Sequence, residues 1–346
     1  MLTASTRVAI LLEDGIRGKH GKTGLAFLRY SNTQIVAVID RFCTGESLVE
    51  LTQIDCSAPI VADMSAALVY KPDVVLIGIA PSGGKLPPNL AQEIKIAVYA
   101  GVSIVNGLHT LLQPQYPNLQ PKQWIWDIRQ EPDGLNIGKA QARSLSAKRI
   151  LTVGTDMAIG KMSASLEIHR AAMAAGIKAE FIATGQAGIA IAGGGIALDA
   201  VRVDFAAGAV EKAVMELAAD SELIVIEGQG SLLHPGSTAT LPLIRGSQPT
   251  GLILVHRAGA KHIRDLPEIA IPPLPEVIKL YETVASAGGT FGDIKVIAIA
   301  LNTFGLDTDT AKRVIQSTVE ETGLPCNDVV RFGGKSLLPA VYDCSG

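Results

Sequence analysis

One stretch, residues 149–165 (RILTVGTDMAIGKMSAS), narrows the possible folds of this chain more than any other. It opens with a short apolar run, 150–153, of the kind found in buried parallel strands. A glycine-bounded loop follows and ends in Gly160 and Lys161, and an Ala-rich helical pattern comes next. This context is typical of a phosphate-binding loop, because backbone N–H groups and the helix dipole converge on one point and the lysine adds a mobile cation. A plain strand-to-helix turn would explain the glycines but not Lys161. The stretch therefore predicts a P-loop NTPase-like domain.

Two departures from the usual loop count against ordinary Mg²⁺-dependent ATP hydrolysis. The glycine spacing has one extra residue, so Thr155 stands where the first glycine is usual. Met162 follows Lys161 at the position where a Ser or Thr hydroxyl normally holds Mg²⁺. Ser163 comes one place late and would face another direction on the helix. We therefore expect the loop to bind a phosphate-bearing ligand without an obligatory metal.

Two later strand ends carry polar groups suited to the same site. Glu227 follows the apolar run 223–226, where P-loop proteins place the group that engages Mg²⁺ or its water. Asn302 follows the run 296–301, where related P-loop folds often contact a base, by analogy. Ligands bind at the carboxyl ends of parallel strands, so we expect one shared site. The predicted catalytic residues are Glu227 and His234, and the predicted cofactor-binding residues are Gly154, Thr155, Asp156, Ala158, Ile159, Gly160, Lys161, Met162, Ser163, Gly228, Gly230 and Asn302.

The first half of the chain repeats the alternation of apolar runs and loops. The runs 7–12, 35–40 and 74–80 are separated by enough residues for the crossovers that parallel pairing requires. A polar segment, 129–148, suggests a domain boundary near residue 147. The predicted fold class is α/β with mainly parallel sheets, comprising a Rossmann-like domain at 1–147 and a P-loop NTPase-like domain at 148–346.

Several loops carry candidate substrate-binding residues. Glycines follow the third predicted strand, where open α/β sheets bind ligands, although a plain turn gives the same pattern. His109 suits either a catalytic base or a hydrogen-bonded loop histidine. The segment 15–23 repeats the Gly-x₅-Gly-Lys spacing, which fits a second phosphate site or an exposed basic turn. The predicted substrate-binding residues are Gly83, Gly84, His109, Gln186, Gln229 and Ser231.

Composition excludes several classes of partner. A net charge of −3 without a basic run argues against nucleic acid, and 4% aromatic residues argue against an RNA-stacking surface. The longest uncharged run, 181–198, is interrupted by glycines, so we expect a buried strand and a flexible loop rather than a membrane span. The four cysteines do not have the sequence spacing of a metal site or of a dense disulfide framework. They fit a reducing compartment, and we expect a cytoplasmic location. The segment 124–128 (WIWDI) alternates and predicts an edge strand. Together with the 48% hydrophobic content, it suggests a buried partner surface and hence a homo-oligomer. The expected substrate is a small molecule.

Five motifs together resemble the DgcN-like family, which includes members assigned as D-glutamate N-acetyltransferases. The most specific is GQGS-x-x-HP at 228–235, and the resemblance runs from about residue 21 to residue 333. The loop GTDMAIGK by itself is also similar to the GTDT-x-x-GKT loop of dethiobiotin synthetase. The other matching strings are FIATGQAGIAI (181–191), GIAPSGGKL (78–86) and IVNGLH (104–109).

The resemblance implies transfer of an acetyl group from acetyl-CoA to the amine of an acidic D-amino acid. The loop would hold the diphosphate of coenzyme A, Glu227 or His234 would accept the amine proton, and N–H groups of 228–230 would stabilise the oxyanion. The alternative is ATP-dependent activation of a carboxylate, with Asp156 and Glu227 replacing the lost Mg²⁺ ligand. A nucleotide-binding protein without turnover is the third reading. The residues alone leave the acyl donor and the handedness of the substrate open.

Overall fold

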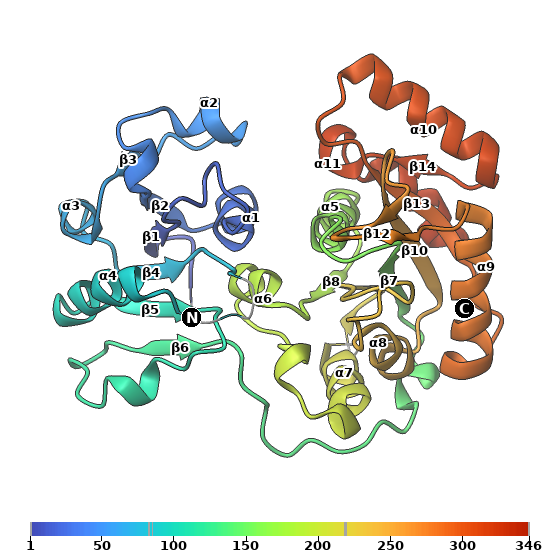
Figure 1. The fold of residues 1–346 in the computed structure, drawn as a ribbon. Helices are drawn as coiled ribbons and strands as arrows, with labels where there is room; N and C mark the ends of the chain where they lie inside the picture. Colours follow the sequence, from blue (N-terminus) through green and yellow to red (C-terminus); the bar gives the residue numbers. More distant parts are fainter. Residues whose placement is uncertain (1, 82–83, 85, 218–219, 345–346) are drawn as a thin grey trace. The chain divides into compact units, whose positions relative to one another are not determined.

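The chain forms two compact units in the computed structural model, which describes residues 2–81, 84, 86–217 and 220–344 (Figure 1). Unit 1 comprises Met1–Gln130 with Gln186–Ala197, and unit 2 comprises Glu131–Gly185 with Leu198–Gly346. Each unit is a parallel α/β layer structure with its own apolar core. The predicted fold class is therefore confirmed.

The division between the units lies at 130–131 and not near residue 147, because the segment 131–147 packs on unit 2. Arg202 forms an ion pair with Glu131, at 2.6 Å between Nη2 and Oε1. The buried carboxylate of Glu211 accepts the backbone N–H of Lys139 at 3.0 Å. The polar composition of this segment suggested a domain boundary, but these partners hold it against helix α7 (Val203–Leu217) and the residue before that helix.

Unit 1 contains a six-stranded sheet in the order β3-β2-β1-β4-β5-β6, with every pairing parallel. This is the order of a Rossmann-like sheet. The predicted edge strand near 124–128 is confirmed as β6. The strands are β1 (Arg7–Leu11), β2 (Gln34–Ile39), β3 (Ile60–Val61), β4 (Val74–Ile77), β5 (Ser103–Asn106) and β6 (Ile125–Asp127), and the helices are α1 (Lys22–Tyr30), α2 (Leu48–Thr52), α3 (Met64–Leu68), α4 (Pro88–Tyr99) and α6 (Gln186–Ala192).

The prediction of a flexible glycine-rich loop after residue 185 is wrong, because helix α6 begins there. Ile189 and Ala190 lie on its buried face, and α6 packs against α1 within unit 1. The first glycine after the helix, Gly193, takes a left-handed conformation at φ 77°, and its N–H bonds the carbonyl of Ile189. The glycines therefore end a short helix and do not form a long loop.

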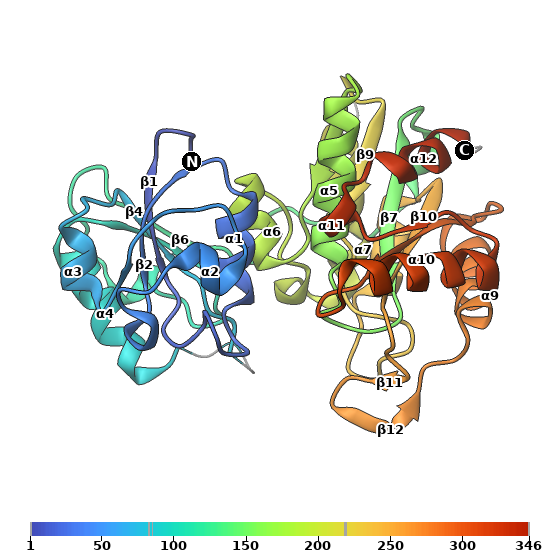
Figure 2. The same cartoon turned by 90° about the horizontal axis from the view of Figure 1, so that it is seen from above.

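Unit 2 contains a second parallel sheet in the order β14-β13-β10-β7-β9-β8. The apolar runs 150–153 and 223–226 form strands as predicted, and they lie in the middle of this sheet together with the strand at 251–257. A two-stranded hairpin, β11 (His262–Ile263) and β12 (Leu266–Ala270), was not predicted and is visible in Figure 2. The other strands are β7 (Lys148–Gly154), β8 (Ala179–Ile182), β9 (Leu223–Ile226), β10 (Gly251–Arg257), β13 (Val296–Asn302) and β14 (Cys326–Asn327); the helices are α5 (Lys161–Ala174), α7 (Val203–Leu217), α8 (Thr240–Ser247), α9 (Leu274–Ala285), α10 (Thr308–Thr322), α11 (Val329–Phe332) and α12 (Leu338–Asp343).

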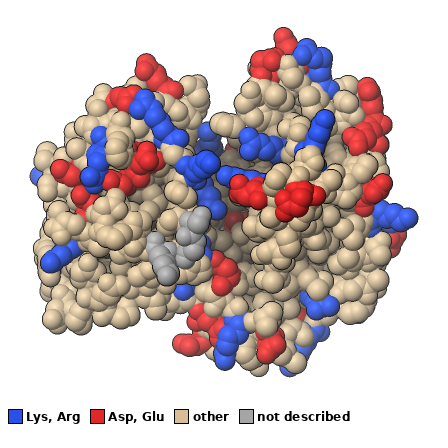
Figure 3. All heavy atoms as spheres, viewed as in Figure 1, with Lys and Arg blue, Asp and Glu red and all other residues tan. Residues whose placement is uncertain are grey.

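The surface carries both signs of charge. Lys and Arg side chains are interspersed with Asp and Glu side chains on the face drawn in Figure 3. Within the part of the chain that the structure describes, no helix has both the length and the apolarity needed to cross a membrane.

Candidate functional site

The loop after β7 has the backbone conformation that an anion site requires. Ala158 and Gly160 both take left-handed conformations, at φ 54° and φ 113°, and α5 begins directly afterwards at Lys161. The N–H groups of the first helical turn have no intrahelical partner, and the helix dipole adds positive potential at this end. The N–H groups of residues 158–162 are the expected donors to an anion, and their binding of one stays a prediction.

Lys161 is folded over this loop. Its ammonium donates a 2.7 Å hydrogen bond to the carbonyl of Asp156, and the side chain is buried. Two glycines leave room for the Lys161 side chain. A Cβ on Gly154 would lie 3.1 Å from Lys161 Nζ, and a Cβ on Gly228 would lie 3.1 Å from Lys161 Cδ. An ammonium group has three N–H donors, so Lys161 can keep its bond to the Asp156 carbonyl and still donate to a bound phosphate.

Asp156 uses both carboxylate oxygens on backbone groups. Oδ1 accepts the N–H of Met157 at 2.6 Å, and Oδ2 accepts the N–H of Arg264, beside hairpin strand β11, at 2.7 Å. Asp156 therefore links the loop to the hairpin through hydrogen bonds. Because both oxygens are engaged, the geometry does not support a role of Asp156 in replacing the lost Mg²⁺ ligand. Among the described residues, no group of three or more His, Cys, Asp or Glu could hold a metal ion.

Asn302 also supports the loop. Its amide Nδ2 donates to the carbonyl of Ile159 at 2.8 Å, and its Oδ1 accepts the N–H of Phe304 at 3.0 Å. Since both ends of the amide are engaged, the geometry favours a structural role over contact with a base. A direct role of Asn302 toward a cofactor stays a prediction.

Glu227 lies at the end of β9 and is 3% exposed. Its Oε2 accepts the backbone N–H of Thr184 at 2.9 Å and of Gly185 at 3.3 Å, and its Oε1 accepts Gln229 Nε2 at 3.0 Å. Burial raises the pKa of this carboxyl to about 7, although the three hydrogen bonds and the charge of Lys161 act in the opposite direction. A carboxyl that titrates near neutrality suits proton transfer.

The glycines after Glu227 are needed for packing. A Cβ on Gly228 would lie 1.7 Å from the Thr152 carbonyl oxygen, and its N–H already donates to Thr152 Oγ1 at 2.9 Å. Gly230 has φ 70°, and a Cβ there would lie 1.8 Å from Ser237 Oγ. The expected contribution of the Gly228 N–H to an oxyanion site is therefore not supported by the geometry.

Ser231 and His234 shape the rest of this loop. Ser231 Oγ accepts the N–H of Leu233 at 3.1 Å. His234 is half-buried, and its Nδ1 accepts the N–H of Gly236 at 3.0 Å. When the ring is neutral, its Nε2 then carries the proton, so His234 presents a donor. This geometry favours Glu227 over His234 as the base.

The candidate residues of unit 1 lie at the carboxyl edge of its own sheet. His109 Nε2 is 2.5 Å from Arg129 Nη1, and the His109 N–H bonds the Gly84 carbonyl. Gly84 has φ 61°, and a Cβ there would lie 2.2 Å from the His109 ring. Gln186 Nε2 lies 3.5 Å from Thr23 Oγ1. Gly83 lies outside the described residues.

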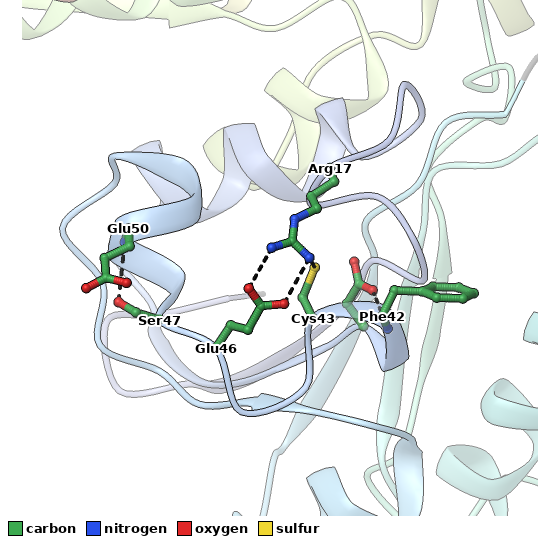
Figure 4. A network of polar contacts seen from close by, with 7 residues as sticks. Arg17, Phe42, Cys43, Glu46, Ser47 and Glu50 are labelled. Carbon is green, nitrogen blue, oxygen red and sulfur yellow. Dashed lines mark hydrogen bonds and ion pairs between the residues drawn. The ribbon is translucent and has the colours of Figure 1, made fainter.

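The second Gly-Lys loop, 15–23, is closed by its own contacts. Arg17 forms a two-pronged ion pair with Glu46, at 2.9 and 2.6 Å (Figure 4). The positive charge of Arg17 is therefore offset by Glu46 and does not require a bound anion. A Cβ on Gly21 would lie 2.1 Å from the Gly15 carbonyl oxygen, which explains the glycine.

Two site residues were missed from the sequence. His256, at the end of β10, bonds Thr155 Oγ1 through its Nδ1 at 2.9 Å. Tyr281, on α9, donates to the Gly154 carbonyl at 2.7 Å. The position of His256 after an apolar run was a usable signal, whereas Tyr281 reads as an ordinary helix residue.

Family models and relatives agree with this arrangement. Residues 136–338 match the P-loop domain of DUF1611, described as a domain of unknown function, and residues 41–131 match its Rossmann-like N-terminal domain. A crystal structure of a DUF1611 family protein from Anabaena variabilis ATCC 29413 has a TM-score of 0.95 and 60% identity, covering 98% of this chain and 99% of that one.

Two curated relatives carry functional names. A protein from a Pseudoalteromonas species, named D-glutamate N-acetyltransferase, is 35% identical over 268 residues, or 76% of this chain and 79% of its own. A protein of the same name from Tritonibacter scottomollicae is 35% identical over 273 residues, or 77% and 80%. With both of its domains matched in order, this chain belongs to the DUF1611 family.

Proposed function

We propose that the protein is an N-acetyltransferase that moves an acetyl group from acetyl-CoA to the amine of an acidic D-amino acid such as D-glutamate. The observation that carries this proposal is the 35% identity, over about three quarters of each chain, to two proteins named D-glutamate N-acetyltransferase. The geometry of unit 2 is compatible with it, because a phosphate loop and a buried carboxyl with a raised pKa belong to the same unit.

The loop of unit 2 fits the diphosphate of coenzyme A. A diphosphate needs N–H donors and a cation, which residues 158–162 and the ammonium of Lys161 supply. It does not need the hydroxyl that Met162 lacks. Bound acetyl-CoA would supply an activated acyl group in the form of a thioester.

Glu227 is the proposed base. In the carboxylate form it would accept a proton from the ammonium group of the amino acid and free the nitrogen lone pair. The nitrogen would then form a bond to the thioester carbonyl carbon, and the carbon–sulfur bond would break. The coenzyme A thiolate leaves, and it takes up the second proton lost by nitrogen. A carboxyl with a pKa of about 7 is half ionised near neutral pH, which suits this exchange.

The test is the release of free thiol from acetyl-CoA in the presence of D-glutamate, L-glutamate or D-aspartate. We expect thiol release with D-glutamate and an N-acetylated product in the mass spectrum. The Glu227→Gln variant is the matched negative control, and Glu276→Gln on helix α9 is the control for a surface carboxyl. Thiol release at background with every amino acid, together with ADP formation from Mg²⁺-ATP and a carboxylate substrate, would overturn the proposal in favour of ATP-dependent activation.

A further inference from the structure

Thr155 forms two hydrogen bonds with strand β10, which is the neighbour of β7 in the sheet of unit 2. Its backbone N–H donates to the Val255 carbonyl at 3.1 Å, and its hydroxyl lies 2.9 Å from His256 Nδ1. Thr155 is fully buried, and His256 is 9% exposed. The side chain at the position usually held by a glycine therefore has a specific partner at the end of the adjacent strand.

The histidine is uncharged under ordinary conditions. Burial lowers the pKa of His256 to about 4, so the ring is neutral at pH 7 and has one donor and one acceptor nitrogen. A neutral ring supplies hydrogen-bond geometry to Thr155 and places no positive charge beside the loop. This role differs from that of Lys161, which supplies charge.

The hydrogen bonds of Thr155 also affect the position of Lys161, the cation of the loop, through Asp156. Asp156 follows Thr155, and its carbonyl oxygen accepts the Lys161 ammonium at 2.7 Å. Because Asp156 is the next residue in the chain, a displacement of Thr155 shifts Asp156 and its carbonyl, the hydrogen-bond partner of Lys161, as well as the start of the loop. The bond between His256 and Thr155 thus bears on both parts of the anion site.

We infer that His256 is a positioning residue of the phosphate loop. By holding Thr155 it fixes the path of residues 155–160, and thereby the N–H groups and the lysine that bind a diphosphate. The inference deepens the proposed function, on which it rests for the identity of the acyl donor. It concerns binding of the donor and not the transfer of a proton.

A double-mutant cycle on Thr155 and His256 tests the positioning role of His256. Inorganic pyrophosphate is the probe, and its affinity is measured by calorimetry. His256→Gln cannot place a polar atom where Nδ1 lies, and we expect its affinity to fall about tenfold, as for a buried polar group left unpaired. His256→Asn places an amide near the Nδ1 position and should keep most of the affinity. Thr155→Val should weaken binding as His256→Gln does, and Thr155→Ser should rescue it.

The double variant Thr155→Val with His256→Gln decides whether the two residues act as a unit. We expect it to bind pyrophosphate about as weakly as either single variant. The matched control is His169→Gln, because His169 bonds the Ala179 carbonyl from α5. Losses that multiply in the double variant would show that His256 does not act through Thr155 and would overturn the inference.

Steady-state kinetics separates positioning from catalysis. In His256→Gln we expect KM for acetyl-CoA to rise about tenfold, with kcat and KM for the amino acid nearly unchanged. A lower kcat at unchanged KM for acetyl-CoA would contradict a positioning role. If the wild type binds no pyrophosphate, the phosphate-loop basis of the proposed function fails. If it binds pyrophosphate and His256→Gln binds it equally well, the inference about His256 alone fails.

Discussion

The hydroxyl of Tyr281 donates a 2.7 Å hydrogen bond to the carbonyl of Gly154 and accepts a 3.0 Å hydrogen bond from the N–H of Leu232. The tyrosine is fully buried on helix α9. It therefore joins the loop after β7 to the loop after β9, which carry Lys161 and Glu227 respectively. This phenol group is one link between the two parts of the candidate site, beside the bond from the Gly228 N–H to Thr152 Oγ1.

Tyr281→Phe should destabilise the protein by about 1–3 kcal/mol, because it leaves the buried carbonyl of Gly154 and the partly buried N–H of Leu232 without their partner. Equilibrium unfolding in urea measures the loss, and Tyr99→Phe, at an exposed position, is the control. We also expect weaker pyrophosphate binding, since the Gly154 end of the loop loses its anchor. Unfolding curves that superimpose on those of the wild type would show that water replaces the hydroxyl.

Lys161→Ala should weaken binding of coenzyme A by about 1.5–3 kcal/mol, the range for hydrogen bonds to charged groups. Calorimetry with coenzyme A, ATP and Mg²⁺-ATP in separate titrations shows which ligand the lysine serves. Lys312→Ala, on helix α10 away from the loop in sequence, is the control for loss of a surface charge. Equal affinity of variant and wild type would make the loop a structural turn.

Glu227→Gln should lower kcat for acetyl transfer by about 10²–10⁴, the usual contribution of a general base. The acidic limb of the pH–rate profile, near the pKa of about 7, should disappear with it. If Glu227 instead serves a metal, the same change abolishes Mg²⁺-dependent ATP turnover and leaves metal-free binding nearly intact. His234→Asn should keep the acidic limb, because its Nδ1 is engaged by Gly236.

The strands and most helices were predictable because burial on both faces leaves continuous apolar runs in the sequence. The predicted run 223–226 coincides with strand β9. Helix α6 was missed, since its glycines read as a loop while Ile189 and Ala190 supply a buried face. The hairpin β11–β12 was missed because Pro267 argued against a strand.

The candidate site was predictable only in part. The loop at Lys161 and the acidic end of β9 follow local rules that residue order displays. The partners of Asp156 and Asn302 do not, because Arg264 and Ile159 are far from them in sequence. Local motifs thus indicated a candidate site, but they could not show which of its polar groups form hydrogen bonds within the protein. The predicted homo-oligomer stays a prediction that light scattering can test.

The pH dependence of stability isolates the buried carboxyl. The pKa of Glu227 rises from 4.5 to about 7 on folding, so the folded state binds more protons than the unfolded state between these values. The contribution of Glu227 to the free energy of unfolding is fully present below pH 4.5. It is lost as the pH rises through about 7, and the loss amounts to up to about 3 kcal/mol.

His256 acts in the opposite sense, because its pKa falls from 6.5 to about 4 and stability rises with pH between these values. The Glu227→Gln variant keeps His256 and removes only the carboxyl. We therefore expect the stability of the wild type relative to Glu227→Gln, measured by urea unfolding from pH 4.5 to 7.5, to decline steadily as the pH rises. A difference that stays constant across this range would mean that Glu227 ionises in the folded protein as it does in the unfolded chain, and its assignment as a base poised near neutrality would fall.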